Sequence, residues 1–220
     1  MNKIYIVILA LSLFVSACEN PAANKTKATV NNTNTTTTTP ANTATAPVKV
    51  AKGEAVSINQ ETSKVEFTGS KVTGKHVGGF KKFTGTIDLV NGKAEESSVS
   101  VDIDMMSVFS DADGLTKHLQ TGDFFEVEKF PKASFASTKI VADASKGADN
   151  FTVTGDLTMR GVTKSITFPA KISVKPEEVS VETEFVISRK DFGIAYAGKA
   201  DDLIRDEVVL NLNLKNTRKK

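Results

Sequence analysis

The chain has 220 residues, of which 40% are hydrophobic and 25% charged, and its formal net charge at pH 7 is +2. A chain of this length can form one or two domains, and so small a net charge gives no support for nucleic-acid binding. There are 13 Phe but 2 Tyr and no Trp. Because Phe adds apolar area without a polar group, this usage suits a dry core or a site for a hydrocarbon ligand. The single cysteine excludes an intrachain disulfide and a cysteine-based metal cluster.

The first residues have the pattern of a bacterial export signal. Lys3 precedes an apolar run over residues 4–15, which is too short for a comfortable membrane span. The sequence VSAC at residues 15–18 resembles a lipobox, which predicts a signal peptide over residues 1–17 and acylation of Cys18. We expect an exported lipoprotein, anchored to a membrane of the bacterial cell envelope and facing the periplasm or the cell surface. An ordinary signal peptide with a chance cysteine is the alternative.

Residues 18–53 are rich in Thr, Asn, Ala and Pro and hold almost no large apolar side chain. Such a segment cannot bury enough surface to offset the entropy lost on ordering. The sequence therefore predicts a disordered tether here, followed by one folded domain over residues 54–216.

From Glu54 onward apolar and polar residues alternate, as they do in antiparallel strands with one buried face. Tight turns are predicted at Asn91-Gly92 and Arg160-Gly161. Closing the strands into a barrel would remove the exposed sheet edges, and about eight strands is a size that can enclose one small ligand. We therefore predict an all-β, about eight-stranded antiparallel barrel, with a two-sheet sandwich as the alternative. The strands are expected within residues 56–69, 83–89, 99–105, 135–140, 151–159, 166–174, 179–187 and 208–214.

The stretch after the third strand departs from this alternation. Acidic residues before Leu115 and a closing Gly122 predict a short helix. Phe124, Phe125 and Phe130 then follow within seven residues. A loop so rich in Phe has to pack on the end of a core or at the mouth of a cavity. The sequence predicts a short helix and a Phe-rich flap over one end of the barrel.

Motifs for catalysis or metal binding are lacking in the sequence. There is no nucleophile elbow, phosphate loop or paired-carboxylate signature. The segment from Asp111 to Gly114 lacks the spacing of a calcium loop, and His76 and His118 are the two histidines of the chain. We expect no catalytic residues, no metal site and no cofactor, and we expect that the protein is not an enzyme.

Three segments resemble the signature blocks of a known family. They are HLQTGDFFEVEKFPKASFAST at residues 118–138, GDLTMRGVTKSITFP at residues 155–169 and SRKDFGI at residues 188–194. All three are similar to blocks of the YceI-like polyisoprenoid-binding family, and the similarity covers most of residues 54–215. The resemblance implies a lipocalin-like barrel in the bacterial envelope that holds a long isoprenoid chain, of the quinone or polyprenyl type.

On this resemblance the protein would sequester or transport the lipid, and its partners would be the isoprenoid and the anchoring membrane, not nucleic acid. Whether it is a monomer or a homodimer stays open. A ligand-free barrel serving as an interaction or stress-related module is the alternative, and an enzyme on an apolar substrate is a further one. Inward-facing side chains would hold the prenyl chain, and the histidine and two arginines of the blocks would meet its head group. The predicted ligand-binding residues are Phe67, Phe83, Val101, Ile103, Met105, His118, Leu119, Phe124, Phe125, Phe130, Phe135, Leu157, Arg160, Phe168, Phe185, Ile187 and Arg189.

Overall fold

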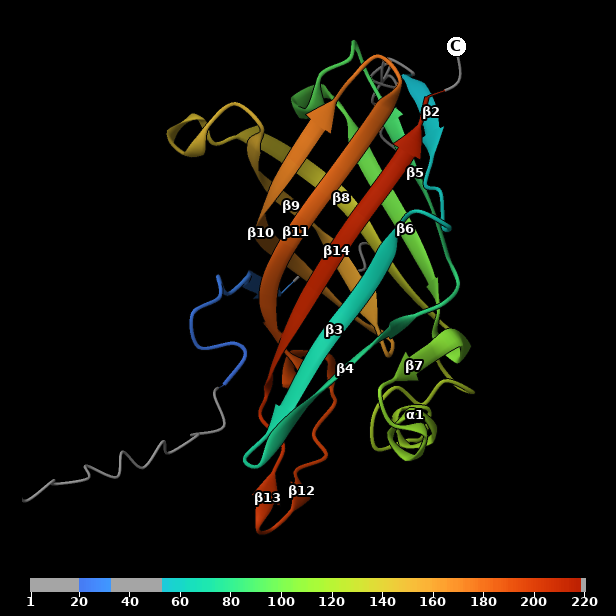
Figure 1. Cartoon of the computed structure of the whole chain (residues 1–220), viewed down its shortest axis with the longest axis vertical. Helices are drawn as coiled ribbons and strands as arrows, with labels where there is room; N and C mark the ends of the chain where they lie inside the picture. Colours follow the sequence, from blue (N-terminus) through green and yellow to red (C-terminus); the bar gives the residue numbers. More distant parts are fainter. Residues whose placement is uncertain (1–19, 33–52, 219–220) are drawn as a thin grey trace, which may run out of the picture.

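The computed structural model describes residues 20–32 and 53–218. Long tilted strands surround a common interior, and one short helix, α1 (Asp113–Leu119), lies near one end (Figure 1). Short 3-10 turns are η1 (Ala94–Glu96), η2 (Met105–Ser107), η3 (Ala144–Lys146) and η4 (Arg189–Phe192). The strands are β1 (Thr29–Asn32), β2 (Glu54–Ser57), β3 (Lys64–Lys71), β4 (Gly74–Phe80), β5 (Phe83–Leu89), β6 (Ser98–Asp104), β7 (Val108–Ser110), β8 (Lys132–Ala142), β9 (Asn150–Met159), β10 (Val162–Val174), β11 (Glu178–Ser188), β12 (Gly198–Lys199), β13 (Asp202–Leu203) and β14 (Glu207–Thr217).

Twelve of these strands form one curled antiparallel sheet. Its order is β2-β5-β6-β8-β9-β10-β11-β14-β3-β4-β7, and β1 joins it by pairing with β10. The predicted all-β antiparallel barrel with a short helix is confirmed, although the strand number exceeds eight. The additional strands are mostly short, and β12 and β13 form a separate two-stranded sheet. The two-sheet sandwich alternative is wrong because the wall is one continuous sheet.

The wall has a seam between β3 and β5, which are not neighbours in the described sheet order. The loop after β2 crosses this seam and joins β5 to β14, the strand paired with β3. The Ile58 N–H donates to the Gly85 carbonyl (2.9 Å), and the Asn59 N–H donates to the Lys215 carbonyl (3.3 Å). Since Ile58 is itself buried, this short connection closes the wall with an apolar side chain as well as hydrogen bonds.

The strand β4 was not predicted, because its glycines have low strand propensity and read as a loop around His76. It pairs with β3 over Gly74–Gly79. A Cβ on Gly78 would lie 2.5 Å from the Phe67 ring and 2.4 Å from the Phe109 carbonyl oxygen. Glycine is therefore required for the close approach of these neighbours, which the sequence pattern does not reveal.

Residues 20–32 also differ from the prediction, which placed them in a disordered tether. They lie beside β10 and β11 (Figure 1), and Ala22 is buried against Val186 and Val209. Composition missed this segment because backbone pairing with the barrel wall, and not a core of its own, holds it. Residues 18–19 and 33–52 of the predicted tether, including Cys18, and the signal peptide lie outside the described residues.

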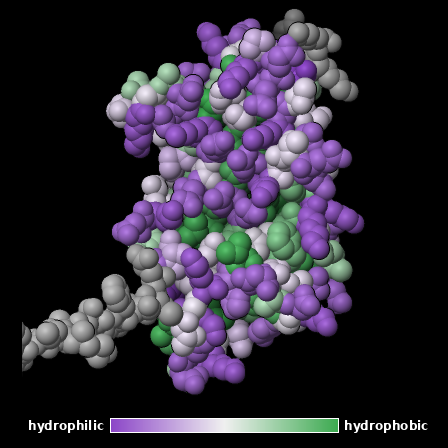
Figure 2. All heavy atoms as spheres, in the orientation of Figure 1, coloured by the Kyte–Doolittle hydropathy of each residue, from purple (hydrophilic) through white to green (hydrophobic). Residues whose placement is uncertain are grey.

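The outer face of the wall in Figure 2 is largely hydrophilic, as the alternating pattern requires. Hydrophobic side chains from the opposite faces of the same strands fill the interior in several adjoining clusters. No helix in residues 20–32 or 53–218 has the length and apolar character needed to cross a membrane.

Candidate functional site

The interior contains an apolar cavity of about 140 Å³. It lies within the curled sheet, because the inward-facing side chains of the long strands make up its wall. Its polar wall residues are Glu66, Ser97, Ser98 and Thr183. The predicted ligand-binding residues on the wall are Val101, Ile103, Met105, Phe135, Leu157, Phe168, Phe185 and Ile187.

Three phenylalanines form the aromatic part of this wall. Phe168 on β10 and Phe185 on β11 stack with their ring centroids 4.2 Å apart. Phe135 on β8 packs against Phe168 at 5.6 Å. A flat aromatic surface surrounded by aliphatic side chains provides dispersion contacts for a hydrocarbon but no partner for a charge.

Sequence reasoning missed much of the aliphatic wall, because the prediction favoured Phe and the matched segments. The same alternation on β10, β11 and β14 carries the signal that would have identified these residues. The missed residues include Ile166, Ile172, Val179, Val181, Leu210 and Leu212.

The remaining predicted apolar residues lie around the cavity but not on its wall. Phe67, Leu119 and Phe124 are buried together in a cluster at the flap end, and Phe125 packs on Phe67 with ring centroids 6.4 Å apart. These side chains close the barrel end, as predicted for the flap. Phe83 lies in a different cluster with Val65 and Val101, and Phe130 packs on Gly161 at the β9–β10 turn.

The predicted head-group residue His118 is engaged within the flap. Its Nε2 atom lies 2.7 Å from a carboxylate oxygen of Asp123. Its ring packs edge-on against the rings of Phe124 and Tyr196, with centroid distances of 4.9 Å and 5.1 Å. His118 therefore orders the flap cluster and does not line the cavity.

Arg160 links all three sequence blocks. It lies in the tight β9–β10 turn with φ of 51°, followed by Gly161 with φ of 73°, as a two-residue type I′ hairpin requires. Its guanidinium donates to the carbonyls of Gly122 and Gly193, both at 2.8 Å, and lies 3.4 Å from the Glu126 carboxylate. This one side chain fastens the flap to the segment after η4.

The predicted Arg189 is also structural in its contacts. It is 4% exposed, and it donates to the carbonyls of Ile194 (2.9 Å) and Arg205 (3.1 Å). Burial lowers the pKa of its guanidinium, while the nearby Asp206 carboxylate opposes that shift. The charge is thus used to hold η4 against the segment before β14.

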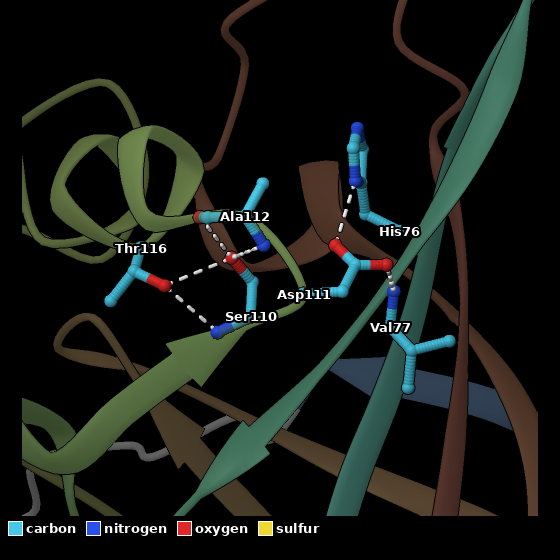
Figure 3. A network of polar contacts seen from close by, with 6 residues as sticks. All are labelled: His76, Val77, Ser110, Asp111, Ala112 and Thr116. Carbon is cyan, nitrogen blue, oxygen red and sulfur yellow. Dashed lines mark hydrogen bonds and ion pairs between the residues drawn. The ribbon is translucent and has the colours of Figure 1, made fainter.

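A second polar network attaches α1 to the sheet (Figure 3). The Asp111 carboxylate accepts a hydrogen bond from the Val77 N–H (3.0 Å) and lies 2.8 Å from the His76 Nδ1 atom. The Ser110 hydroxyl donates to the Ala112 carbonyl (2.8 Å), and the Ser110 N–H donates to the Thr116 hydroxyl (2.9 Å). These bonds fix the start of the helix beside β4 and β7.

Among the described residues, no group of three or more His, Cys, Asp or Glu is placed to hold a metal ion.

The chain is similar to several known proteins. A UPF0312 protein of Pseudomonas putida is 37% identical over 127 residues, which cover 55% of this chain and 65% of that protein. The protein YceI of Escherichia coli is 35% identical over 123 residues, covering 53% of this chain and 62% of that protein. The match thus spans slightly less than two thirds of the length of these relatives.

Solved structures share the fold. Burkholderia cenocepacia BcnA has a TM-score of 0.63 at 23% identity, covering 72% of this chain and 98% of that one. A polyisoprenoid binding domain from Saccharophagus degradans has a TM-score of 0.60 at 18% identity, covering 76% of this chain and 100% of that one. The YceI-like domain family matches residues 57–216, which is most of the chain and includes the whole cavity wall. The chain therefore belongs to the YceI-like domain family.

Proposed function

We propose that this protein binds a long isoprenoid lipid, of the quinone or polyprenyl type, and sequesters or carries it without altering it chemically. The observation that supports this is the cavity, whose wall is almost entirely aliphatic and aromatic. Burying a prenyl chain there gains about 25 cal/mol for each Å² of apolar surface removed from water. The structurally similar Saccharophagus domain is described as polyisoprenoid binding, which agrees with this ligand class.

The cavity has to widen to accept such a ligand. Its volume of about 140 Å³ is close to that of an engineered cavity of about 150 Å³ that binds a single benzene ring. A prenyl chain of several five-carbon units needs more room. Binding therefore includes an outward movement of wall side chains or strands.

The head group would remain outside the apolar interior, because the wall offers it few polar partners. We further propose that the protein acts in the bacterial cell envelope, with the acylated Cys18 as its membrane anchor. The export signal and the lipobox-like VSAC sequence support this location.

The small cavity favours a second candidate, a filled barrel that acts as an interaction module without a ligand. Mass spectrometry of an organic extract separates the two. We would express residues 20–220 behind a cleavable export signal in bacteria and purify the protein without detergent. A prenyl lipid in stoichiometric amount is expected. An empty extract, together with no binding of added quinone or polyprenol, would favour the filled barrel.

A further inference from the structure

The wall of the barrel divides between β10 and β11. These two strands form a ladder over Lys171–Val174 and Val179–Glu182. Beyond that, β10 stays paired with β9 along Val162–Lys171, and β11 stays paired with β14 along Glu178–Ser188. The result is a fork, which is held together at one end and open along the rest of both strands.

The sequence contributes to where the ladder ends. Pro169 lies two residues beyond the last β10 partner and has no N–H to donate. The Thr183 hydroxyl donates to the Pro169 carbonyl at 2.6 Å, so a side chain makes the bond there. Phe168 and Phe185, the next pair in the same direction, are joined by ring stacking.

The N-terminal segment fills the open part of this fork. The strand β1 pairs antiparallel with β10, from Thr29 opposite Thr167 to Asn32 opposite Lys164. On the other side, the Ala28 N–H donates to the Val186 carbonyl (2.8 Å), and the Val186 N–H donates to the Thr26 carbonyl (2.9 Å). Residues 26–32 thus satisfy backbone groups that β10 and β11 no longer share.

The same segment closes the cavity with side chains. Ala28 and Val30 pack against the core cluster that contains Phe168, Phe185 and Ile187, and those three residues line the cavity. The inner face of residues 26–32 is therefore part of the apolar closure between the cavity and solvent.

The ion pairs that attach this segment to the barrel are weak. The ion pairs Lys25–Glu184 and Lys27–Glu207 are substantially exposed, and such pairs contribute little and are screened by salt. The segment is joined to the barrel through residues 33–52, so its release leaves the main sheet ladders intact. Release would also free β10 and β11 to separate, which widens the cavity.

The other boundaries of the cavity are closed more firmly. At the flap end, Leu119 and Phe124 are buried, and Arg160 holds the flap in place by donating to the Gly122 carbonyl. At the opposite end, Val56, Leu89 and Val179 are buried together. The seam between β3 and β5 is crossed by the loop that connects β2 to β3. That loop cannot move away from the wall without disturbing both strands.

We infer that the β10–β11 fork is the lateral route by which a prenyl chain enters the barrel, and that residues 26–32 are the removable strand that closes it. This inference rests on the proposed function, since it assigns an access route to the same cavity. Asn20 lies two residues after Cys18, the predicted acylation site. The segment that closes the fork is therefore the one that leads to the proposed membrane anchor, where a lipid ligand would be met.

A reversible disulfide between β1 and β10, called the β1 lock, tests the entry route. In the full chain carrying Cys18→Ser, Thr29→Cys and Thr167→Cys place two thiols at register partners of β1 and β10. Thr167 faces outward because its neighbours Ile166 and Phe168 line the cavity. Thr29 is exposed, and its neighbours Ala28 and Val30 pack on the core. Paired antiparallel residues have a spacing suited to a disulfide. The control lock is Ser173→Cys with Ser180→Cys, which are partners in the intact part of the β10–β11 ladder.

The readout is the association rate of fluorophore-labelled farnesol before and after reduction. When the disulfide between β1 and β10 is formed, association of the probe is expected to be at least about tenfold slower. The reason is that β1 can then no longer leave β10 to open the fork. Reduction should restore the rate, and the control lock should leave it unchanged. Equal association rates in the oxidised and reduced protein would overturn the proposed entry route but not the proposed lipid binding. Failure of the reduced protein to bind at all would overturn the proposed function and the route together.

A second variant tests the route without a disulfide. Val30→Ser weakens the apolar closure while leaving the backbone pairing of β1 available. The expected result is faster association of the same probe with a nearly unchanged unfolding midpoint. An association rate equal to or below that of the unmodified chain would count against the closing role of residues 26–32.

Discussion

Single side chains at the flap end join segments that are far apart in the sequence. Arg160 binds carbonyl groups of Gly122 and Gly193, and Arg189 binds those of Ile194 and Arg205. Because a guanidinium presents donors in several directions, it can satisfy carbonyls from separate loops at once. The arginines of the three blocks thus have an architectural use that is visible without any ligand.

The carboxylate of Asp111 makes the attachment of α1 depend on pH. Its pKa is lowered below the usual value, chiefly by the hydrogen bond from the Val77 N–H and further by the His76 side chain, while burial opposes the shift. A lowered folded-state pKa adds stability above the unfolded pKa of about 3.9, and this contribution is lost as the pH falls through the folded-state value.

We therefore expect Asp111→Asn to reduce the free energy of unfolding at pH 7 but to change it little well below pH 4. Urea denaturation of the unmodified chain and the variant at both pH values measures this difference. Asp149→Asn, at an exposed loop position, is the control for loss of a carboxylate. An equal effect of Asp111→Asn at the two pH values would contradict the role of its charge.

At the scale of elements, β4 depends on Gly78 and Gly79, which permit close packing. A Cβ on Gly78 would lie 2.4 Å from the Phe109 carbonyl oxygen, which is backbone and cannot easily move. By contrast, a Cβ on Gly74 in the same strand would meet nothing within 4 Å. Both glycines belong to β4, but only Gly74 has room around it for a Cβ atom.

Gly78→Ala is expected to destabilise the protein by about 1–3 kcal/mol, the usual cost of overpacking. Gly74→Ala, the matched control, is expected to be neutral or to stabilise by a few tenths up to about 1 kcal/mol through the unfolded state. Chemical denaturation of both variants measures the difference. Similar free energies of unfolding for the two would show that the close contact at Gly78 is relieved without cost.

At the scale of the whole molecule, the cavity can be tested by filling it. Val153 is buried and lies on the cavity wall, so Val153→Phe places a ring in the space proposed for the lipid. The affinity for a prenyl probe should fall at least about tenfold, which corresponds to about 1.4 kcal/mol. Equilibrium titration with fluorophore-labelled farnesol measures it.

The control is Val141→Phe, the same substitution at an exposed position of β8. It should leave the affinity unchanged. If Val153→Phe is folded and binds the probe as tightly as the control, the prenyl chain does not occupy this cavity.

The main strands other than β4, the short helix and eight residues of the cavity wall could be predicted because their signals are local. Alternation with a period of two placed Val101 and Ile103 on one face of β6, and the density of Phe identified the flap. The positions of His118, Arg160 and Arg189 could not be predicted in the same way. Each has several polar neighbours within reach only after distant loops come together, so sequence alone left their partners undetermined.

Side-chain alternation and three matching segments were enough to indicate the β character of the chain, the inward faces of its long strands and its family. Only the folded arrangement shows that Gly74–Phe80 is a strand, that the cavity is small and that residues 26–32 complete the wall. The reason is physical. Side-chain alternation is a property of one strand, whereas the point at which a ladder ends, and the segment that fills the gap, depend on hydrogen-bonding groups supplied by residues far away in the chain.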